Sequence, residues 1–231
     1  MTVLFSRRTL AAAALCAVVL PAFAQKTTAR DALRRFVTEA KTASGRFTQT
    51  VTDKAGQVID GPSTGRFAFE RPSRFAWKTE KPYVQDIVSD GKTIRLYDKD
   101  LDQLTVKSAE TMVSGAPAAL LFGRAEALEN FTLTEVKAPE GAVTAVKAEP
   151  KTQDAAFVSA VVGFDAAGLP AVLVLTDAFG GRTQLVLTDV VTNHALPEGI
   201  FTVKTGPETT VLKTVRYFSE GRGISSGGPV D

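Results

Sequence analysis

Two short motifs are the first candidates for chemistry, and the first of them suggests a hydrolase. Gly223-Ile224-Ser225-Ser226-Gly227 matches the G-x-S-x-G pattern of a nucleophilic serine. That pattern requires a strand before the serine, a helix after it and a histidine further along the chain. The single histidine, His194, lies upstream in a predicted loop and has no evident orienting partner. We therefore expect no catalytic residue and no enzyme activity, and a secreted esterase that uses Ser225 is a weaker alternative.

The second motif, Asp98-Lys99-Asp100-Leu101-Asp102, resembles the start of a calcium-binding loop. The sixth position of such a loop is glycine and the twelfth is glutamate, but this chain has Gln103 and Ala109 there. We predict a solvated hairpin turn instead. The chain also has only one Cys and one His, which argues against a zinc enzyme, a cysteine enzyme and a disulfide scaffold. No metal and no cofactor are expected.

The aromatic residues carry a stronger signal. Phe67 and Phe69 share one face of a predicted strand, and Phe75 and Trp77 share one face of the next, because side chains alternate with period two. Pro72 stands between the two strands and requires a turn or a sheet edge there. Arg71 is thereby placed at the rim of an aromatic face. Four such rings are also compatible with an ordinary hydrophobic core.

Several later strands are apolar on both faces, which favours an apolar cavity over a simple core. They are residues 158–162, 171–175 and 185–187. Continuous apolar strands mean that both faces of the sheet are covered or that one face lines a cavity. The chain has few helices to cover a large sheet. We therefore predict a half-closed antiparallel barrel with short movable helices over an apolar cavity.

The elements that position these residues can be read from the periodicity. Thr28 is the predicted N-cap of an amphipathic helix that contains Leu33 and Phe36, with Gly45 as its C-cap. After Gly45 the pattern changes to short apolar runs separated by Asp-Gly and Gly-Gly turns, which is typical of an antiparallel meander. About eleven strands are expected, near residues 46–52, 57–69, 73–79, 83–89, 92–98, 101–107, 131–137, 142–149, 156–164, 170–177 and 182–189.

Two further segments depart from the strand pattern. Residues 109–129 are rich in alanine and leucine and contain Pro117, which favours one or two short apolar helices. Residues 205–231 form a C-terminal extension with many glycines, in which 211–218 could form a strand or a short helix. Its end, from Gly221, is expected to be disordered.

The first 24 residues are predicted to be a secretory signal peptide. Arg7 and Arg8 precede an uncharged apolar run, and Ala22-Phe23-Ala24 is a small-x-small cleavage site. The paired arginines leave both the general secretory route and the twin-arginine route open. Cleavage of the signal peptide lowers the number of basic residues from 27 to 25, equal to the 25 acidic residues, and also removes Cys16. A neutral mature chain is a poor nucleic-acid ligand, and its expected location is the periplasm of a bacterium.

The mature chain resembles the LolA family of outer-membrane lipoprotein carriers. The resemblance extends from about Ala29 to Val203 and rests on several weak motifs that occur in the family's order. They are Phe47-Thr48-Gln49, Gly65, the RPxxFxW match Arg71-Pro72-Ser73-Arg74-Phe75-Ala76-Trp77, Val88-Ser89-Asp90-Gly91-Lys92-Thr93, Tyr97-Asp98, Pro197 and Phe201. Some relatives have tryptophan where this chain has Phe69 and Arg95, so the strand that carries Arg95 is expected to face solvent there.

The resemblance implies a fold, a function and partners. The family fold is an incomplete antiparallel barrel with a helical lid over a hydrophobic cavity. Its members take lipid-modified lipoproteins from the inner-membrane LolCDE transporter and deliver them to the LolB receptor on the outer membrane. Arg71 takes the family's role of holding the lid shut, and Phe75 the role of handling the lipoprotein. The expected cavity residues are Phe47, Phe67, Phe69, Phe75, Trp77, Ile94, Leu96, Leu120, Leu121 and Phe122.

Two other functions are possible for the same fold, a receptor and a sensor. A LolB-like receptor should begin with a lipid-anchored cysteine, and the Ala22-Phe23-Ala24 site argues against one. A periplasmic lipid-binding envelope sensor often adds a second domain, for which this chain has little room. We therefore expect a monomeric carrier domain over residues 25–204, followed by the extension 205–231.

Overall fold

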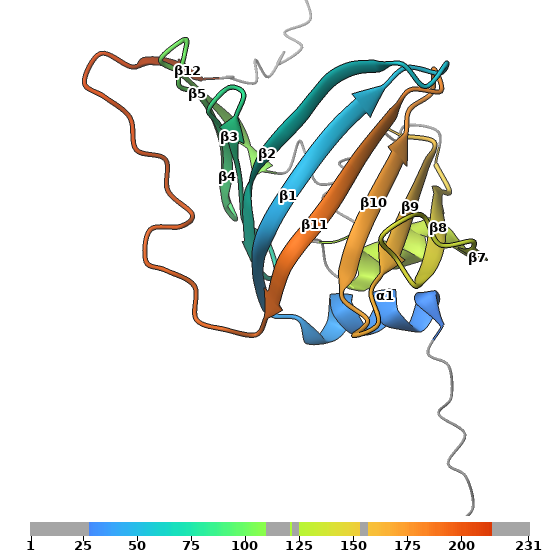
Figure 1. The fold of residues 1–231 in the computed structure, drawn as a ribbon. Coiled ribbons are helices and arrows are strands. Elements are labelled where there is room, and N and C mark those ends of the chain that lie inside the picture. Colours follow the sequence, from blue (N-terminus) through green and yellow to red (C-terminus); the bar gives the residue numbers. More distant parts are fainter. Residues whose placement is uncertain (1–27, 110–120, 122–124, 153–156, 214–231) are drawn as a thin grey trace, which may run out of the picture.

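A computed structural model describes residues 28–109, 121, 125–152 and 157–213. One curved sheet and one long helix make up most of this part of the chain (Figure 1). The predicted signal peptide, most of the segment 109–129 and the end of the extension lie outside the described residues. No helix among the described residues is long and apolar enough to span a membrane.

Helix α1, Ala29–Glu39, begins where the sequence predicts. The Thr28 hydroxyl accepts the backbone N–H of Asp31 at 3.1 Å, as an N-cap does. The Glu135 carboxylate, from a distant strand, accepts the N–H groups of Ala29 at 3.2 Å and Arg30 at 2.8 Å. Both contacts satisfy donors that the first turn of a helix leaves free, and the carboxylate also complements the helix dipole.

The predicted C-cap at Gly45 is wrong. The last residue of the helix is Glu39 and its C-cap is Ala40, whose N–H bonds to the carbonyl of Phe36 at 3.1 Å. Gly45 lies inside the first strand. A Cβ atom built on Gly45 would approach the Phe67 ring at 2.8 Å and the Thr188 carbonyl oxygen at 2.9 Å. Glycine is needed there for close packing rather than for a left-handed turn.

The strands form a single sheet in which all neighbours but one pair are antiparallel. Its order is β12-β6-β5-β4-β3-β2-β1-β11-β10-β9-β8-β7, and only β12 and β6 run parallel. The strands are β1 Thr42–Thr52, β2 Val58–Glu70, β3 Arg74–Lys81, β4 Gln85–Asp90, β5 Thr93–Asp98, β6 Gln103–Ser108, β7 Phe131–Val136, β8 Thr144–Pro150, β9 Ser159–Phe164, β10 Pro170–Thr176, β11 Arg182–Thr192 and β12 Thr210–Lys213. The predicted meander is confirmed, with β12 as an additional strand among the described residues.

The turn glycines behave as the sequence predicts. Gly56, Gly91, Gly141, Gly168 and Gly180 all have positive φ angles, which glycine adopts without strain. They close the hairpins between successive strands. The short helix η2, Ala125–Asn130, is the described part of the segment that we expected to be helical, together with the helical residue Leu121.

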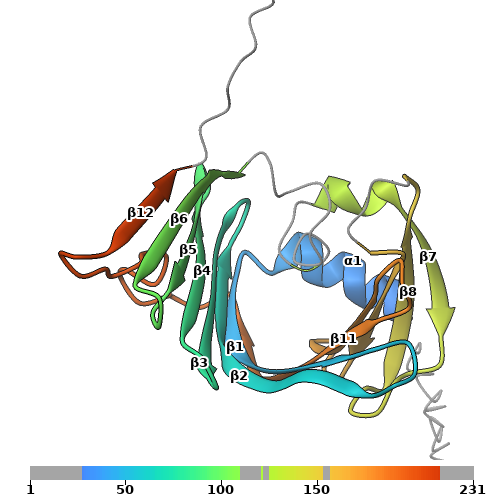
Figure 2. The same ribbon diagram turned by 90° about the horizontal axis from the view of Figure 1, so that it is seen from above.

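The sheet curves around α1, which lies on its concave side (Figure 2). The main core fills this side, where α1 presents Leu33, Phe36 and Val37 to apolar residues of β1, β2 and β8–β11. Leu121 is part of the same core and is 2% exposed. The concave side therefore holds the apolar surface that the sequence predicts, and in this structure α1 packs against it.

A chain segment, residues 193–209, covers the convex side of β2, β3 and β4. Phe201 joins Ala68, Ala76 and Val88 in a second, smaller core, and the guanidinium of Arg74 lies 4.4 Å from the centre of the Phe201 ring. Figure 1 shows this segment running from the end of β11 to β12. It explains how β2–β4 can bury apolar residues on both faces.

Strand β12 is held by a polar cluster at the β5–β6 turn. Asp102 accepts hydrogen bonds from the Tyr97 hydroxyl at 2.9 Å and from the Thr209 hydroxyl at 2.7 Å. The carboxylate raises the pKa of Tyr97 above its usual value, because ionising the phenol would break the bond to a negative group. The first residues of the extension thus continue the sheet. Of the range 211–218, the part up to Lys213 is a strand, and the rest lies outside the described residues.

Candidate functional site: an aromatic concave face with an arginine at its rim

The four rings singled out in the sequence meet on the concave face. Phe67 lies directly opposite Trp77 in the β2–β3 ladder, and Phe69 lies opposite Phe75. Phe47, from β1, stacks on Trp77 with 3.8 Å between the ring centres and 19° between the planes. Phe47, Phe67 and Phe69 are buried, whereas Phe75 and Trp77 are half-buried and pack against the same core. The structure therefore brings these five predicted residues together.

Arg71 lies where the β2–β3 turn meets the end of α1. Its Nε donates to the carbonyl oxygen of Ala40, the C-cap of α1, at 2.8 Å. Its Nη2 donates to the carbonyl oxygen of Leu121 at 2.8 Å. One side chain thus joins the turn to α1 and to the helical residue Leu121, which lies in the segment 109–129, for which the sequence predicts short apolar helices.

Arg71 also lies over aromatic rings. Its guanidinium carbon is 4.8 Å from the centre of the Phe69 ring and 5.9 Å from that of Phe36, within the range of a cation–π interaction. Burial lowers the pKa of Arg71 below its usual value to about 10, because the charged form is partly removed from water. The group still carries its charge at neutral pH. The half-buried guanidinium depends on these carbonyl acceptors, because part of its hydration is lost in the closed structure. The two hydrogen bonds therefore hold the turn against the end of α1.

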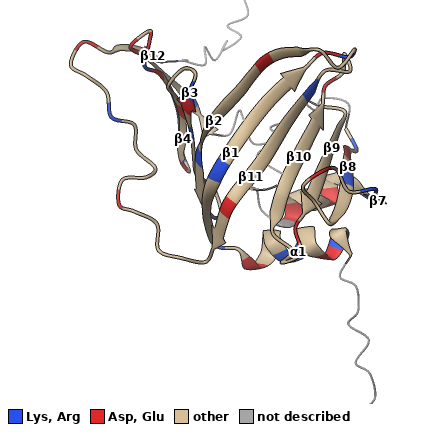
Figure 3. Ribbon diagram, viewed as in Figure 1, with Lys and Arg blue, Asp and Glu red and all other residues tan. Residues whose placement is uncertain are grey.

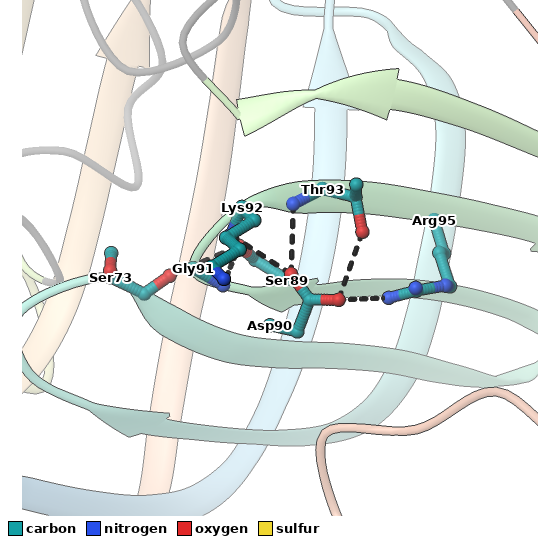
Figure 4. A network of polar contacts seen from close by, with 7 residues as sticks. All are labelled: Ser73, Ser89, Asp90, Gly91, Lys92, Thr93 and Arg95. Carbon is teal, nitrogen blue, oxygen red and sulfur yellow. Dashed lines mark hydrogen bonds and ion pairs between the residues drawn. The ribbon is translucent and has the colours of Figure 1, made fainter.

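A second hairpin supports the turn that carries Arg71 (Figure 4). The buried Ser89 hydroxyl donates to the carbonyl oxygen of Ser73 at 3.0 Å and accepts the N–H of Gly91 at 3.2 Å. A Cβ atom on Gly91 would lie 2.9 Å from the Ser73 hydroxyl, so the two turns are in close contact. The Ser89-Asp90-Gly91 motif therefore fixes the β2–β3 turn from one side.

Asp90 closes the β4–β5 hairpin through four hydrogen bonds. Its Oδ1 accepts the N–H groups of Lys92 at 2.9 Å and Thr93 at 2.8 Å, and its Oδ2 accepts from the Thr93 hydroxyl and from Arg95. Burial raises the pKa of Asp90, but the bond from Arg95 and the three others outweigh it, so the pKa lies well below its usual range. By the strand register, Arg95 lies on the face opposite Ile94 and Leu96, as the expectation of an outward-facing charge requires.

We expect Asp90→Asn to destabilise the protein by about 1 kcal/mol at neutral pH, the usual value for a charged hydrogen bond near the surface. A carboxylate with a depressed pKa stabilises the fold above its unfolded pKa of about 4, and this contribution is lost as the pH falls through the lower folded value. Urea unfolding of both proteins from pH 7 to pH 3 measures the effect. A stability difference that stays constant over this range would contradict the assignment.

The remaining predicted cavity residues are distributed less evenly. Ile94 is buried and Leu96 half-buried, and their register partners Ser89 and Ile87 place them on the concave face. They lie outside the core that α1 covers. Leu121 lies in that core. Leu120 and Phe122 lie outside the described residues.

His194 differs from its sequence interpretation because it has a partner. Its Nε2 lies 3.1 Å from the Ser44 hydroxyl, and its backbone carbonyl accepts from Thr42 at 2.8 Å. Its buried Nδ1 has no hydrogen-bond partner among the described residues, whereas a catalytic triad places a carboxylate there. Within the same residues no group of three or more His, Cys, Asp or Glu could hold a metal ion. Sequence reasoning could not pair His194 with Ser44, since 150 positions separate them.

The geometry agrees with the family comparison. A family model described as outer membrane lipoprotein carrier protein LolA matches residues 38–204. The chain belongs to the LolA family. An outer-membrane lipoprotein carrier protein of Nitrosospira multiformis is 39% identical over 169 residues, which are 73% of this chain and 81% of the relative. One of Cupriavidus necator is 37% identical over 205 residues, which are 88% of this chain and 95% of the relative.

Solved structures similar to this LolA-family chain are distant in sequence. A conserved protein of Thermus thermophilus has a TM-score of 0.49 and 16% identity, over 80% of this chain and 97% of the other. A LolA-superfamily protein of Nitrosomonas europaea has a TM-score of 0.44 and 11% identity, over 77% of this chain and 99% of the other. The sheet topology and the match to the family model confirm the predicted fold class, an open antiparallel β structure of the LolA type.

Proposed function

We propose that this chain is a periplasmic chaperone that binds the acyl chains of lipoproteins released from the inner membrane and carries them to an outer-membrane receptor. The observation that carries the proposal is the aromatic concave face, which α1 covers and Arg71 ties at its rim. The relatives' names as outer-membrane lipoprotein carriers support it. The protein acts by binding and release and has no enzymatic step.

The energetics of acyl chains fit a face that can be uncovered and covered again. Each buried methylene contributes about 0.8 kcal/mol, so one chain of about sixteen carbons gains on the order of 10 kcal/mol. A site that bound the acyl chain with this full free energy, and with no competing interaction, would release its cargo too slowly. Closing of α1 over the aromatic residues competes with the lipid, because the same apolar side chains are covered in either state. The competition lowers net affinity and makes transfer possible.

The proposal includes specific partners and a route. The donor is an inner-membrane ABC transporter of the LolCDE type and the acceptor is a LolB-type receptor. The chain is exported after cleavage behind Ala24 and works as a monomer, with residues 25–204 as the carrier domain. Mass spectrometry of the mature N-terminus tests the cleavage. A lipid-modified cysteine at that end would instead indicate a receptor.

The direct test is release of a radiolabelled lipoprotein from inner-membrane spheroplasts in the presence of the purified mature protein. A soluble one-to-one complex is the expected result. Phe69→Ala, which removes a fully buried ring from the concave face, should reduce the amount of complex, whereas Phe179→Ala, which removes a ring that is 88% exposed, should not. A correctly folded protein that releases no lipoprotein would overturn the carrier function and favour a lipid-binding sensor.

A further inference from the structure

A basic groove runs along one side of α1, from Arg30 to Thr38, and is bounded on its other side by η2, strand β7 and Lys151. Its volume is about 790 Å³. Arg30, Arg34 and Lys151 line it with positive charge, and Leu128, Phe131 and Leu133 supply an apolar lining. Figure 3 shows basic and acidic positions along α1 and near β7 and β8. The groove is therefore amphipathic, with cations beside apolar side chains.

The fold brings these cations together from separate parts of the chain. Arg30, Arg34 and the groove residue Thr38 are four positions apart, which places them along one side of α1. Arg30 is oriented by a bond from Nη2 to the carbonyl oxygen of Leu133 at 2.8 Å. Lys151 follows β8, and its Nζ donates to the carbonyl oxygen of Glu129 at 2.8 Å. Both groups keep further donors for a ligand.

Arg34 has no carboxylate to neutralise it among the described residues. Its side chain is exposed, and the described part of the chain gives its guanidinium no hydrogen bond and no ion pair. Among the described residues, Glu129 is the one acidic residue that lines the groove. The nearby Glu135 is engaged by the N–H groups of Ala29 and Arg30. In the described part of the lining, three cations and one carboxylate leave a net positive charge.

We propose that this groove binds the headgroup of an anionic phospholipid at a membrane surface. A guanidinium pairs with phosphate oxygens through two parallel N–H bonds, and a lysine ammonium adds a point charge. The apolar lining suits the glycerol backbone and the first methylenes of the lipid. The Thr38 hydroxyl adds a neutral donor or acceptor.

The structure favours a lipid over an acidic peptide that adds a strand to β7. Strand addition uses the free backbone groups of an edge strand. β7 is an edge strand, but the Leu133 carbonyl already accepts from Arg30, so an added strand would have to displace that side chain. A phosphodiester needs side-chain donors only. The inference goes beyond the proposed carrier function, because it concerns how the empty protein meets a membrane rather than how it holds an acyl chain.

Vesicle flotation tests the proposal with the mature full-length protein. The probes are vesicles of phosphatidylcholine alone and of phosphatidylcholine mixed with phosphatidylglycerol. We expect binding to the mixed vesicles only, weakened by salt, and about fivefold weaker for Arg34→Gln, since one cation at a membrane surface contributes about that factor. Adding Lys151→Gln should weaken it by a similar factor again.

Arg35→Gln is the matched control, because Arg35 is exposed on the same helix, carries the same charge and does not line the groove. It should bind within about twofold of the native protein, since only its distant charge is lost. Equal losses for Arg34→Gln and Arg35→Gln would overturn the proposal, and so would equal binding to both kinds of vesicle. Two competitors identify the ligand chemistry. Soluble glycerol phosphate should weaken binding to the mixed vesicles, because it carries the same phosphate headgroup as the lipid. An acidic peptide that displaces the protein where glycerol phosphate does not would indicate a protein partner and overturn binding to a membrane lipid.

The experiments distinguish the membrane-binding groove from the carrier function. Arg34→Gln should float poorly but still form the soluble lipoprotein complex, because Arg34 makes no contact with the concave aromatic face. Loss of flotation with normal complex formation supports the groove and leaves the carrier function in place. Normal flotation without complex formation overturns only the carrier function.

Discussion

Replacing Arg71 by leucine should leave α1 free to separate from the β2–β3 turn and should slow the transfer of bound lipoprotein to its acceptor. The change removes the bonds to the carbonyl oxygens of Ala40 and Leu121. Hydrogen bonds from a charged donor contribute about 1.5–3 kcal/mol each. A combined loss of about 3 kcal/mol shifts the opening equilibrium roughly a hundredfold. Because the closed empty state competes with cargo, weakening it strengthens retention.

Two measurements check the Arg71 prediction. Hydrogen exchange at the last turn of α1, around Phe36 and Ala40, should become faster in Arg71→Leu. The rate at which a preformed lipoprotein complex passes its cargo onward should fall. Arg66→Leu is the control, because Arg66 is an exposed β2 residue that pairs with Glu80 at the surface. Native rates of both exchange and transfer in Arg71→Leu would contradict the closing role of this side chain.

Replacing Gly65 by alanine should destabilise the protein by about 3 kcal/mol or more, which is large for the addition of one methyl group. A Cβ atom on Gly65 would overlap the carbonyl oxygen of Lys78 in the neighbouring strand and would lie 2.7 Å from the Phe47 ring. Neither the ladder nor the ring can move without disturbing the stack of Phe47 on Trp77. The glycine therefore makes room for the aromatic face.

Trp77 is the only tryptophan of the chain, so its fluorescence reports on this stack during urea unfolding. Gly65→Ala should lower the midpoint and also change the native emission, because the ring packed against Trp77 is displaced. Gly206→Ala is the control: its nearest neighbour, the Thr209 hydroxyl, would lie at an ordinary 3.8 Å. Equal midpoints for the two variants would show that β2 tolerates a side chain at position 65.

Local patterns were sufficient to predict most of the fold. Alternation of apolar residues and the positions of turn glycines located eleven strands, because both are properties of neighbouring residues. The same alternation placed Phe67 and Phe69 on one face and Phe75 and Trp77 on one face of the next strand. A tight turn at Pro72 then makes them meet.

Patterns with two physical meanings were interpreted incorrectly or incompletely. Gly45 after an amphipathic helix is typical of a C-cap, but here it accommodates the Phe67 ring. A local sequence cannot distinguish a glycine needed for a positive φ from one needed for close approach. His194 was expected to lack an orienting partner, because its partner Ser44 is brought to it only by the pairing of β1 with β11.

Short-range order in the sequence was enough to predict the strands, the helix, the aromatic rows and the family resemblance. Which distant groups meet depends on how the sheet and helix pack. Arg71 reaches acceptors 31 and 50 positions away, and in the basic groove Arg30 bonds to Leu133, 103 positions away. The way the curved sheet closes around α1 creates these contacts, and it joins residues too far apart in the chain for a local pattern to pair them.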